Sequence, residues 1–563
     1  MAKIKDALVE MVIVFLVGGL IGAVLAVVSN LFVSGVQYFS DQREASEFFL
    51  VAFGDYSVSL SPLAFLWTAA LVVVFIRTTL GVAKWAGPAD AMYAAHQINE
   101  PLDIKRGFAS TLAAFTSASG GASVGQYGPL VHFGATMGVW VKRFLTSRLS
   151  HDVYLGCGVA AAISAGFNAP IAGVVFAHEA VLRHFSLRAI APIAVASVTA
   201  SALGTSWFPS VAGFDVSFSV PELAELVPIL VVLAPILAVV AMVFMHSLRF
   251  GASLPPKLKI SPIAAPFIAA TVCGLVGIWV PQILGLGIDS MNDMIAGQFT
   301  IGLLITVLVA KILMTSLCIG FGLFGGVFSP ALFVGVSAGA LAGQLAVIFG
   351  IGDVSNVLAI ASMAAVSSAV IGAPVSAVLI ILELTKSYDC AVAAMLAVMI
   401  CSLLTHRLFG HSFFDRQLLD RDIDLQKGRE AIALSQQKME DLASDDYVAL
   451  DPGSDGVHAV EKLKKRGHTE GYIVDENGKM IGKISIYDAL KAGEAKVKTV
   501  LEVNPIILLS GESLAVAMEK VSQFVGESLP VVNEENDLLG TVTEGDLFQA
   551  VIDVQRDARS MER

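Results

Sequence analysis

Long apolar segments recur through the first three quarters of the chain. They cover residues 9–34, 59–83, 188–206, 222–247, 262–280, 298–317 and 388–407. Each is close to or above the roughly 20 residues that a helix needs to cross the hydrocarbon core of a membrane. We therefore expect an all-α, polytopic membrane domain. The first segment follows Lys3 and Lys5, so we expect a retained first helix with a cytoplasmic amino end.

Shorter apolar segments lie between the long ones, and they begin or end at glycine or proline. They cover residues 105–119, 129–146, 153–165, 170–184, 330–350, 357–370 and 374–386. Several are too short for a full crossing. Interrupted helices of this kind are typical of transporters, where they line a site near the membrane midplane.

Two of these short segments occur twice in the same order. Asn168–Ala180 and Gly372–Leu384 both read Ala-Pro, then small and apolar residues, then a glutamate nine positions after the proline. Upstream, Tyr127–Gly134 and Phe328–Gly335 both carry a glycine five positions after a proline. The prolines are 41 residues apart in the first half and 44 in the second. This spacing predicts a duplicated transport fold, although packing of small residues alone would be a simpler explanation.

The last part of the chain has a different composition. Residues 421–563 hold 17 basic and 27 acidic residues, whereas residues 1–420 hold 19 and 21. The segments Tyr472–Leu490 and Leu529–Val551 repeat a strand, a polar turn, a second strand and a helix start. We expect a soluble α/β tail, and its acidity argues against nucleic acid as a partner.

The sequence offers little for enzymatic or metal chemistry. Its five cysteines are scattered in apolar segments, so they form neither a disulfide framework nor a metal-binding pair. There is no nucleophile–base pair and no metal cluster. We expect a protein that is not an enzyme and that needs no metal.

The short segments do suggest anion chemistry. A helix start leaves backbone N–H groups unpaired and carries partial positive charge. Four starts have a proline in or near the first turn: Gly128-Pro129, Ala169-Pro170, Ser329-Pro330 and Ala373-Pro374. We expect them to converge and to bind an anion through partial charges, which permit release as well as binding.

Four stretches, "GGASVGQYGP", "GFNAPIAGVVFAHE", "GGVFSP" and "IGAPVSAVLIILELT", resemble the signature segments of the CLC family of chloride channels and chloride/proton exchangers. The resemblance covers about residues 10–420, and the tail resembles a CBS-domain pair. It implies inverted repeats, a homodimer with one pore per subunit, and an integral protein of a bacterial inner or plasma membrane, in contact with lipid and with both termini cytoplasmic. The expected domains are a membrane domain (1–420), a linker helix (421–444) and two CBS domains (445–495 and 496–563).

The chain departs from the family at the pore. The family glutamate that gates the pore and carries protons aligns with Tyr127, and the inner proton glutamate aligns with Ala180. A coordinating serine aligns with Ala86 and an inner tyrosine with Phe414. The resemblance assigns the anion pathway to Ala86, Gly87, Gly125, Gln126, Tyr127, Gly128, Val327, Phe328, Ser329 and Phe414, with Tyr127 as the gate. The alternative role for Tyr127 is an aromatic plug or a packing residue.

Other polar residues have two readings each. His178 and Glu179 are candidates for a non-standard proton path, although Glu179 and Glu383 also suit helix capping. In the CBS pair, Ser485, Asp488, Thr543 and Asp546 match a pattern that binds adenosine nucleotides. The alternative is a structural pair that binds nothing.

These observations favour an anion channel or proton-uncoupled anion transporter, with chloride as the expected ion and the CBS pair as modulator. A tyrosine is neutral at pH 7 and cannot carry a proton as a carboxylate does. Two alternatives stay open. One is a proton-coupled chloride exchanger with a non-standard proton path, and the other is a transport-inactive sensor.

Overall fold

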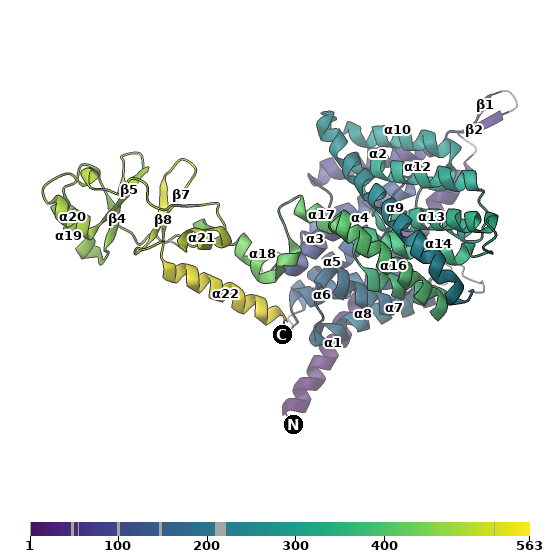
Figure 1. Cartoon of the computed structure of the whole chain (residues 1–563), viewed down its shortest axis with the longest axis horizontal. Coiled ribbons are helices and arrows are strands. Elements are labelled where there is room, and N and C mark those ends of the chain that lie inside the picture. Colours follow the sequence, from purple (N-terminus) through teal and green to yellow (C-terminus); the bar gives the residue numbers. More distant parts are fainter. Residues whose placement is uncertain are drawn as a thin grey trace. The chain divides into compact units, whose positions relative to one another are not determined.

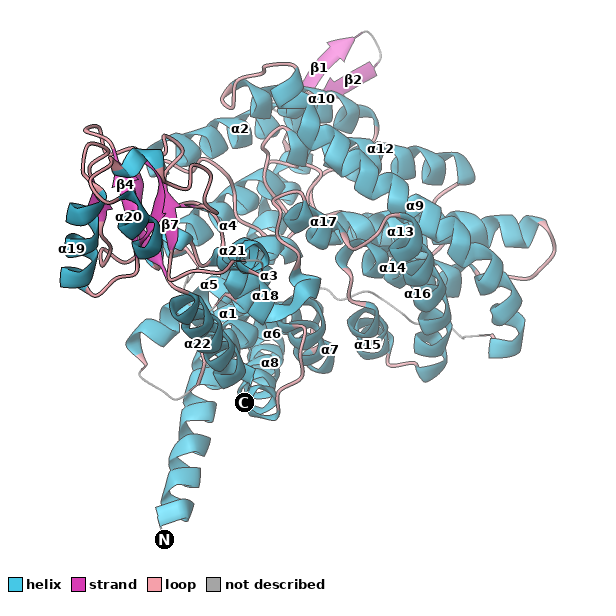
Figure 2. Ribbon diagram, turned by 60° about the vertical axis from the view of Figure 1, so that its left-hand side comes forward, coloured by secondary structure: helices cyan, strands magenta, loops and turns pink. Residues whose placement is uncertain are grey.

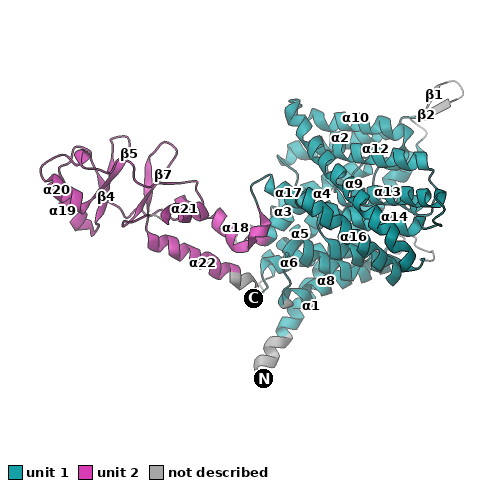
Figure 3. Ribbon diagram, in the orientation of Figure 1, with its two compact units in different colours: residues 1–95, 100–423 teal, residues 96–99, 424–563 magenta. Residues whose placement is uncertain are grey.

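The computed structural model describes residues 2–46, 50–53, 56–97, 102–145, 149–208, 221–522 and 524–562. The chain forms two compact units, which Figure 3 distinguishes by colour. Unit 1 holds residues 1–95 and 100–423, and unit 2 holds residues 96–99 and 424–563. The prediction of a mostly helical membrane part followed by an α/β tail is confirmed.

Unit 1 is a layered bundle of helices with one β-hairpin, β1 (Leu50–Phe53) and β2 (Tyr56–Ser59) (Figure 1). Its helices are α1 (Ala2–Ala45), α2 (Ser61–Leu80), α3 (Pro88–His96), α4 (Ile104–Ser119), α5 (Tyr127–Phe144), α6 (His151–Phe167), α7 (Pro170–Phe176), the π-helix η1 (Ala177–Leu182), α8 (Leu187–Trp207), α9 (Leu223–Lys257), α10 (Ala264–Trp279), the short η2 (Pro281–Ile283), α11 (Ile288–Ile295), α12 (Ile301–Gly320), α13 (Phe328–Ile348), α14 (Ser355–Ile371), α15 (Pro374–Thr385), α16 (Tyr388–Leu408) and α17 (Phe413–Leu419).

The described part of the chain has seven helical segments long and apolar enough to span a membrane, and they differ from the predicted set at two points. The segment expected to be short near residue 330 is the 21-residue helix α13. It begins at Phe328, before its proline, and runs on to Ile348. Conversely, α10 has only 16 residues, because it ends at Trp279, two residues before Pro281.

Matched helices of the two halves pack in the same way. Gly134 on α5 lies against the backbone of Gly158 on α6, so closely that a Cβ added to Gly158 would fall 1.8 Å from the Gly134 carbonyl oxygen. At the matched position on α13, a Cβ on Gly335 would fall 2.5 Å from the Ser362 carbonyl oxygen of α14. Small residues permit this backbone approach in both halves.

The two halves also exchange carboxylates. Glu383, near the end of α15, accepts hydrogen bonds from the backbone N–H groups of Ile171 (2.9 Å) and Ala172 (2.8 Å) in the first turn of α7. Glu179, on η1, accepts from the N–H groups of Val375 (2.9 Å) and Ser376 (2.8 Å) in the first turn of α15. Each half thus caps a helix of the other.

This exchange corrects one expectation from the sequence. The helix starts at Ala169-Pro170 and Ala373-Pro374 were expected to face an anion. Instead, their N–H groups are taken by Glu383 and Glu179. A carboxylate already occupies the site that an anion would need.

Unit 2 contains two similar sheets with their helices, shown in a turned view in Figure 2. The first sheet has the order β3-β4-β5 and the second β6-β7-β8, each with one parallel and one antiparallel pair. The strands are β3 (Ala449–Leu450), β4 (Glu470–Val474), β5 (Met480–Ser485), β6 (Leu508–Leu509), β7 (Leu529–Val532) and β8 (Leu538–Val542). The helices are η3 (Leu425–Lys427), α18 (Gly428–Gln436), η4 (Met439–Asp441), α19 (Gly456–Arg466), α20 (Ile486–Ala492), η5 (Val497–Thr499), α21 (Leu514–Val521) and α22 (Glu544–Glu562).

The segment expected to be a linker helix is broken into short pieces, of which α18 is the longest. The end of this segment belongs to the core of the second repeat, because Met439 is fully buried there with Leu508, Leu514 and Leu529. The domain boundaries inside the chain stay predictions.

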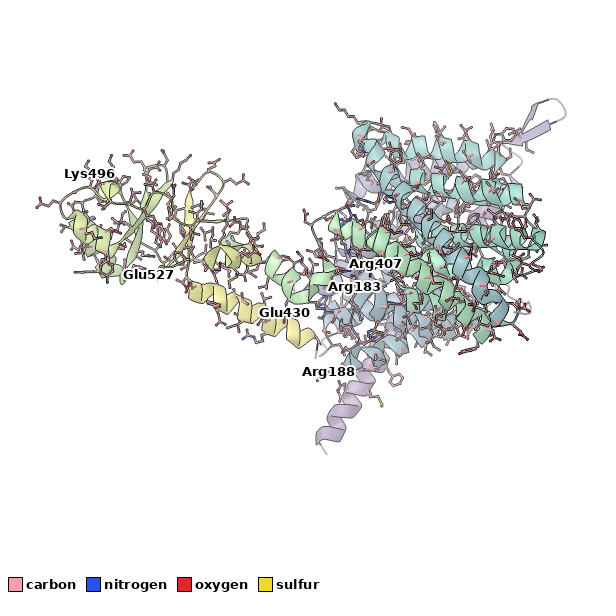
Figure 4. All side chains as sticks on the ribbon, viewed as in Figure 1. Arg183, Arg188, Arg407, Glu430, Lys496 and Glu527 are labelled. Carbon is pink, nitrogen blue, oxygen red and sulfur yellow. The ribbon has the colours of Figure 1, made fainter. Side chains whose placement is uncertain are left out.

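The two CBS-like repeats of unit 2 are joined by a second exchange of carboxylates. Glu527, labelled in Figure 4, accepts from the backbone N–H groups of Thr469 (2.6 Å) and Glu470 (3.1 Å). Glu470 in turn accepts from the N–H groups of Glu527 (2.8 Å) and Ser528 (3.2 Å). The buried Lys483 ammonium lies 2.6 Å from Glu470 and balances its charge.

His468 also contributes to the contact between the two repeats. His468 Nδ1 lies 2.9 Å from Glu527 Oε1, and its Nε2 lies 3.3 Å from Asp446 Oδ1. Although burial alone would lower the pKa of His468, the hydrogen bonds and charges of Glu527 and Asp446 raise it above its usual value. The protonated imidazole therefore strengthens the link between the repeats.

The exchanged carboxylates of unit 1 predict a stability effect. Glu179→Ala and Glu383→Ala should each reduce the free energy of unfolding by about 1–3 kcal/mol, because each leaves two N–H groups of a helix start unpaired. Denaturant titration of the purified protein in detergent measures the loss. Glu225→Ala, which removes an exposed glutamate in the first turn of α9, is the control; an equal loss there would contradict the capping role.

The His468 link predicts a pH dependence. A group whose folded pKa is raised stabilises the fold fully below its unfolded pKa of about 6.5, and the contribution is lost as pH rises through the folded pKa. The difference in thermal midpoint between the wild type and His468→Gln should therefore be largest near pH 6 and shrink toward pH 9. A difference that grows with pH would contradict this assignment.

Candidate functional site

The loops before α5 and α13 meet at the centre of the candidate site. The N–H of Gly125 donates to the carbonyl of Gly326 (2.8 Å), and the N–H of Gly326 donates to the carbonyl of Gly125 (2.6 Å). Each glycine lies four residues before the proline of its helix. A side chain fits at neither position, since an added Cβ would lie 2.9 Å from the Gly326 carbonyl at Gly125 and 2.8 Å from the Gly128 nitrogen at Gly326. This reciprocal bridge fixes the two helix starts side by side.

A serine extends the bridge. Ser329 Oγ accepts from the backbone N–H of Gln126 at 3.4 Å, so its hydroxyl reaches from one half of the fold to the other. The family resemblance assigns Ser329 to the anion pathway. In the structure, the Ser329 oxygen accepts the hydrogen bond that links the two loops, and its O–H can still donate another.

The bridged helix starts leave backbone donors available. In the described part of the chain, no hydrogen-bond acceptor is found for the N–H groups of Tyr127 and Gly128 on α5, or for those of Val327, Phe328 and Ser329 at the start of α13. These unpaired N–H groups at two neighbouring helix starts form an electropositive region without a charged side chain. Chemically, this arrangement suits a small anion.

The ring of Tyr127, the first residue of α5, lies in an aromatic cluster. It stacks on Phe167 with ring centroids 3.8 Å apart and contacts Phe328 at 5.4 Å. Its hydroxyl donates to the carbonyl of Gly166 over 3.4 Å. The residue is 5% exposed. Gly166 is required here, because a Cβ at that position would lie 2.8 Å from the tyrosine ring.

A cavity of about 380 Å³ ends at this ring. Tyr127, Gln126 and Phe167 line one part of it, and Asn168, Ser201, Glu383 and Lys386 line another. Hydroxyl and amide groups supply most of its polar lining. The cavity thus contacts both polar side chains and the stacked rings of Tyr127 and Phe167.

The loop before α3 lies next to this joint, but its donors are occupied. Pro88 is a neighbour of Gly128, whose added Cβ would lie 3.5 Å from the proline ring. The Ala86 N–H donates to Ser110 Oγ (2.9 Å) and the Gly87 N–H donates to Asp90 Oδ2 (2.8 Å). The backbone donors of the predicted pathway residues Ala86 and Gly87 are thus capped by two side chains in this structure.

The last predicted pathway residue lies on another element. Phe414, on α17, is buried and packs against Phe413 with ring centroids 5.9 Å apart. Asp415, its neighbour, forms an ion pair with Arg183, which Figure 4 labels and which follows η1. This pair fixes α17 beside the end of the π-helix.

The two candidate proton carriers lie on η1 itself. Both oxygens of Glu179 are used in capping α15. His178 is fully buried; its Nδ1 lies 2.9 Å from the carbonyl of His184, and its ring stacks on Phe185 at 4.9 Å. Its Nε2 has no partner among the described residues. Both residues lie in a π-helical turn, and such turns are frequent at functional sites.

The sequence analysis did not identify two buried basic residues, Lys311 and Arg43. Lys311 on α12 is 0% exposed, and its ammonium donates to the carbonyls of Ile283 (2.9 Å) and Gly285 (3.2 Å). The Gly285 N–H donates to the Gly121 carbonyl, and the guanidinium of buried Arg43 lies against Gly121. A lone lysine inside the apolar segment 298–317 was the available signal.

The predicted nucleotide residues of unit 2 are helix caps in this structure. Ser485 Oγ accepts from the Asp488 N–H (3.1 Å) and donates to its carboxylate (2.6 Å) at the start of α20. Thr543 and Asp546 make the same pair at the start of α22, at 3.1 and 2.7 Å. The two pairs occupy equivalent positions in the two repeats.

Comparison with known proteins agrees with this architecture. Residues 68–406 match the family described as voltage gated chloride channel, and residues 439–495 and 497–553 match the CBS domain.

Two relatives and one solved structure illustrate the likeness. A protein of Ralstonia nicotianae, named as a ClcB-like chloride channel protein, is 27% identical over 356 residues, covering 60% of this chain and 80% of its own length. The H(+)/Cl(-) exchange transporter ClcA of Klebsiella pneumoniae is 25% identical over 449 residues, covering 76% and 92%. The crystal structure of a eukaryotic CLC transporter has a TM-score of 0.63 at 19% identity and covers 96% and 98%.

The family match spans more than half of the chain and includes both bridged loops, Gly125–Gly128 and Gly326–Ser329. The likeness to the solved structure concerns the fold alone. The chain thus belongs to the voltage-gated chloride channel family, whose members are membrane channels and transporters of anions rather than enzymes, and it carries a CBS-domain pair after the membrane domain.

Proposed function

We propose that this protein conducts chloride, or another small monovalent anion, without obligatory exchange for protons. The proposal depends on Tyr127. By the resemblance of the sequence motifs, Tyr127 takes the position of the gating glutamate of the family. It lies at the start of α5, one of the two bridged helix starts at which the described structure shows unpaired N–H groups.

The side chains at the two proton positions support the uncoupled reading. A carboxylate can compete with chloride and take up a proton. Tyr127 is neutral at pH 7 and Ala180, aligned with the inner glutamate, does not ionise. The neighbouring Glu179 is engaged with Val375 and Ser376, so it is poorly suited to carry protons.

The aromatic cluster supports a steric gate. Tyr127 must leave its stack with Phe167 and Phe328 before an anion can reach the N–H groups of the helix starts. An aromatic pair contributes about 0.5–1.5 kcal/mol beyond burial. That energy is small enough for thermal opening, and the long bond to Gly166 adds little to it.

The rest of the proposed arrangement follows the family. The CBS pair modulates transport, and an adenosine nucleotide is its candidate ligand through Ser485, Asp488, Thr543 and Asp546; their mutual capping bonds would be exchanged for bonds to ribose and phosphate. The protein works as a homodimer in a bacterial inner or plasma membrane with both termini in the cytoplasm. No metal or other cofactor is required.

Two observations favour alternatives. The unpartnered Nε2 of His178 would serve a proton-coupled exchanger with a non-standard path. The close stacking of Tyr127 would suit a transport-inactive sensor, in which the ring seals the pathway permanently.

Proton coupling is tested directly in liposomes. With an imposed chloride gradient and an ionophore to dissipate voltage, chloride efflux should proceed without a steady change in external pH. The ClcA relative of Klebsiella pneumoniae, named as an H(+)/Cl(-) exchanger, is the positive control. Steady proton movement opposite to chloride, lost in His178→Ala, would establish the exchanger instead.

Substitution of Tyr127 tests the gate. Tyr127→Ala removes both aromatic contacts and should increase the chloride flux roughly tenfold, because about 1.4 kcal/mol corresponds to a factor of ten. Tyr127→Phe keeps the stack and should change the flux less than threefold. Tyr154→Phe is the matched control, since the Tyr154 hydroxyl also donates to a carbonyl over 3.4 Å. No flux in the wild type with flux in Tyr127→Ala would favour the sensor.

A further inference from the structure

A second pocket of unit 1, about 520 Å³ in volume, lies at the end of α2. It is built from the turn after α2, the start of α4 and the residue Arg421. Four of its nine lining residues are cations, namely Lys84, Lys105, Arg106 and Arg421. None of them lines the Tyr127 cavity.

The two arginines are held in place by the surrounding backbone and by one carboxylate. Arg106 donates to the carbonyls of Lys84 (2.7 Å) and Trp85 (3.2 Å). Arg421 lies 2.9 Å from Asp90, which is also 4.0 Å from Arg106. The guanidinium groups thus form a fixed wall, and Asp90 neutralises only one of the two charges.

The two lysines are the uncompensated part of the pocket. In the part of the chain that the structure describes, neither the Lys84 nor the Lys105 ammonium forms an ion pair. The remaining acid of the pocket, Asp103, accepts from the Arg106 N–H as the cap of α4 (3.2 Å). Partial burial and the nearby Arg421 hold the pKa of Lys84 below its usual range. An added anion would relieve this repulsion.

The position of the pocket indicates which anion it suits. Helix α2, which is long and apolar enough to span a membrane, ends at Leu80, so the pocket lies beside the end of a candidate spanning helix. Leu80 and Val82 give it an apolar side next to the cations. Lipid phosphates lie at this depth, and basic pockets at membrane surfaces bind anionic headgroups.

We propose that this pocket binds a phosphate group, carried by an anionic lipid headgroup or by a soluble phosphate compound. A single halide would leave most of the volume empty. A phosphate accepts several charge-assisted hydrogen bonds at once. The two lysine ammonium groups, and the guanidinium N–H groups that are not bonded to Lys84, Trp85 or Asp90, are the donors for it. The site is separate from the anion pathway, so this proposal does not rest on the gating role of Tyr127.

Binding to the full-length protein in detergent separates the two sources. The probes are dioctanoyl phosphatidic acid and inorganic pyrophosphate, with dioctanoyl phosphatidylcholine as the zwitterionic control, and the readouts are thermal midpoint and Kd. Lys84→Gln combined with Lys105→Gln should weaken binding at least about tenfold. Lys257→Gln combined with Lys259→Gln removes the same charge from an exposed site at the end of α9 and should leave Kd within twofold.

Binding of phosphatidic acid alone, weakened only in the pocket variant, supports the proposal and identifies the lipid as the source. Binding of both phosphate probes supports it with a soluble source as well. No binding of either probe, or an equal loss in the two double variants, overturns it. Without probe, both double variants should have the thermal midpoint of the wild type, which verifies that they are folded.

Discussion

The pair of hydrogen bonds between Gly125 and Gly326 is the constraint on which the site depends. Each loop supplies one donor and one acceptor, so neither half of the fold can form its helix start independently of the other. The bridge holds α5 and α13 start to start, and side chains larger than glycine would separate them. The positions of Tyr127 and Phe328, and hence the aromatic layer, follow from this contact.

The exchanged carboxylates divide the helix starts into two classes. At α7 and α15, Glu383 and Glu179 fill the region of positive potential. At α5 and α13 the described structure offers no such carboxylate, and an aromatic ring takes its place. A similar exchange joins the two repeats of unit 2, where the carboxylates of Glu470 and Glu527 each accept a hydrogen bond from the backbone N–H of the other residue. Duplicated elements are thus connected by charge-assisted hydrogen bonds, which are stronger than neutral ones.

Much of this could be predicted from the sequence, because apolar length and proline spacing are local signals. The short segments 105–119, 153–165 and 357–370 correspond closely to α4, α6 and α14. The swapped caps could not be assigned, since a glutamate nine residues after a proline does not reveal which helix it reaches. The same holds for Ala86 and Gly87, whose donors are taken by Ser110 and Asp90. Lys311 was missed although it is a lone lysine in an apolar segment, and only the fold connects it to the Gly121 loop.

The central claim is that the N–H groups of one pair of helix starts are unpaired and can bind an anion, whereas those of the other pair are bonded to carboxylates. Anomalous diffraction from crystals grown in bromide tests it most directly. The account predicts a bromide peak within hydrogen-bond distance of the N–H groups of Gly128 or Phe328, strengthened in Tyr127→Ala, and none at Ile171 or Val375. A peak at the starts of α7 or α15, or none between α5 and α13 in either protein, would contradict it.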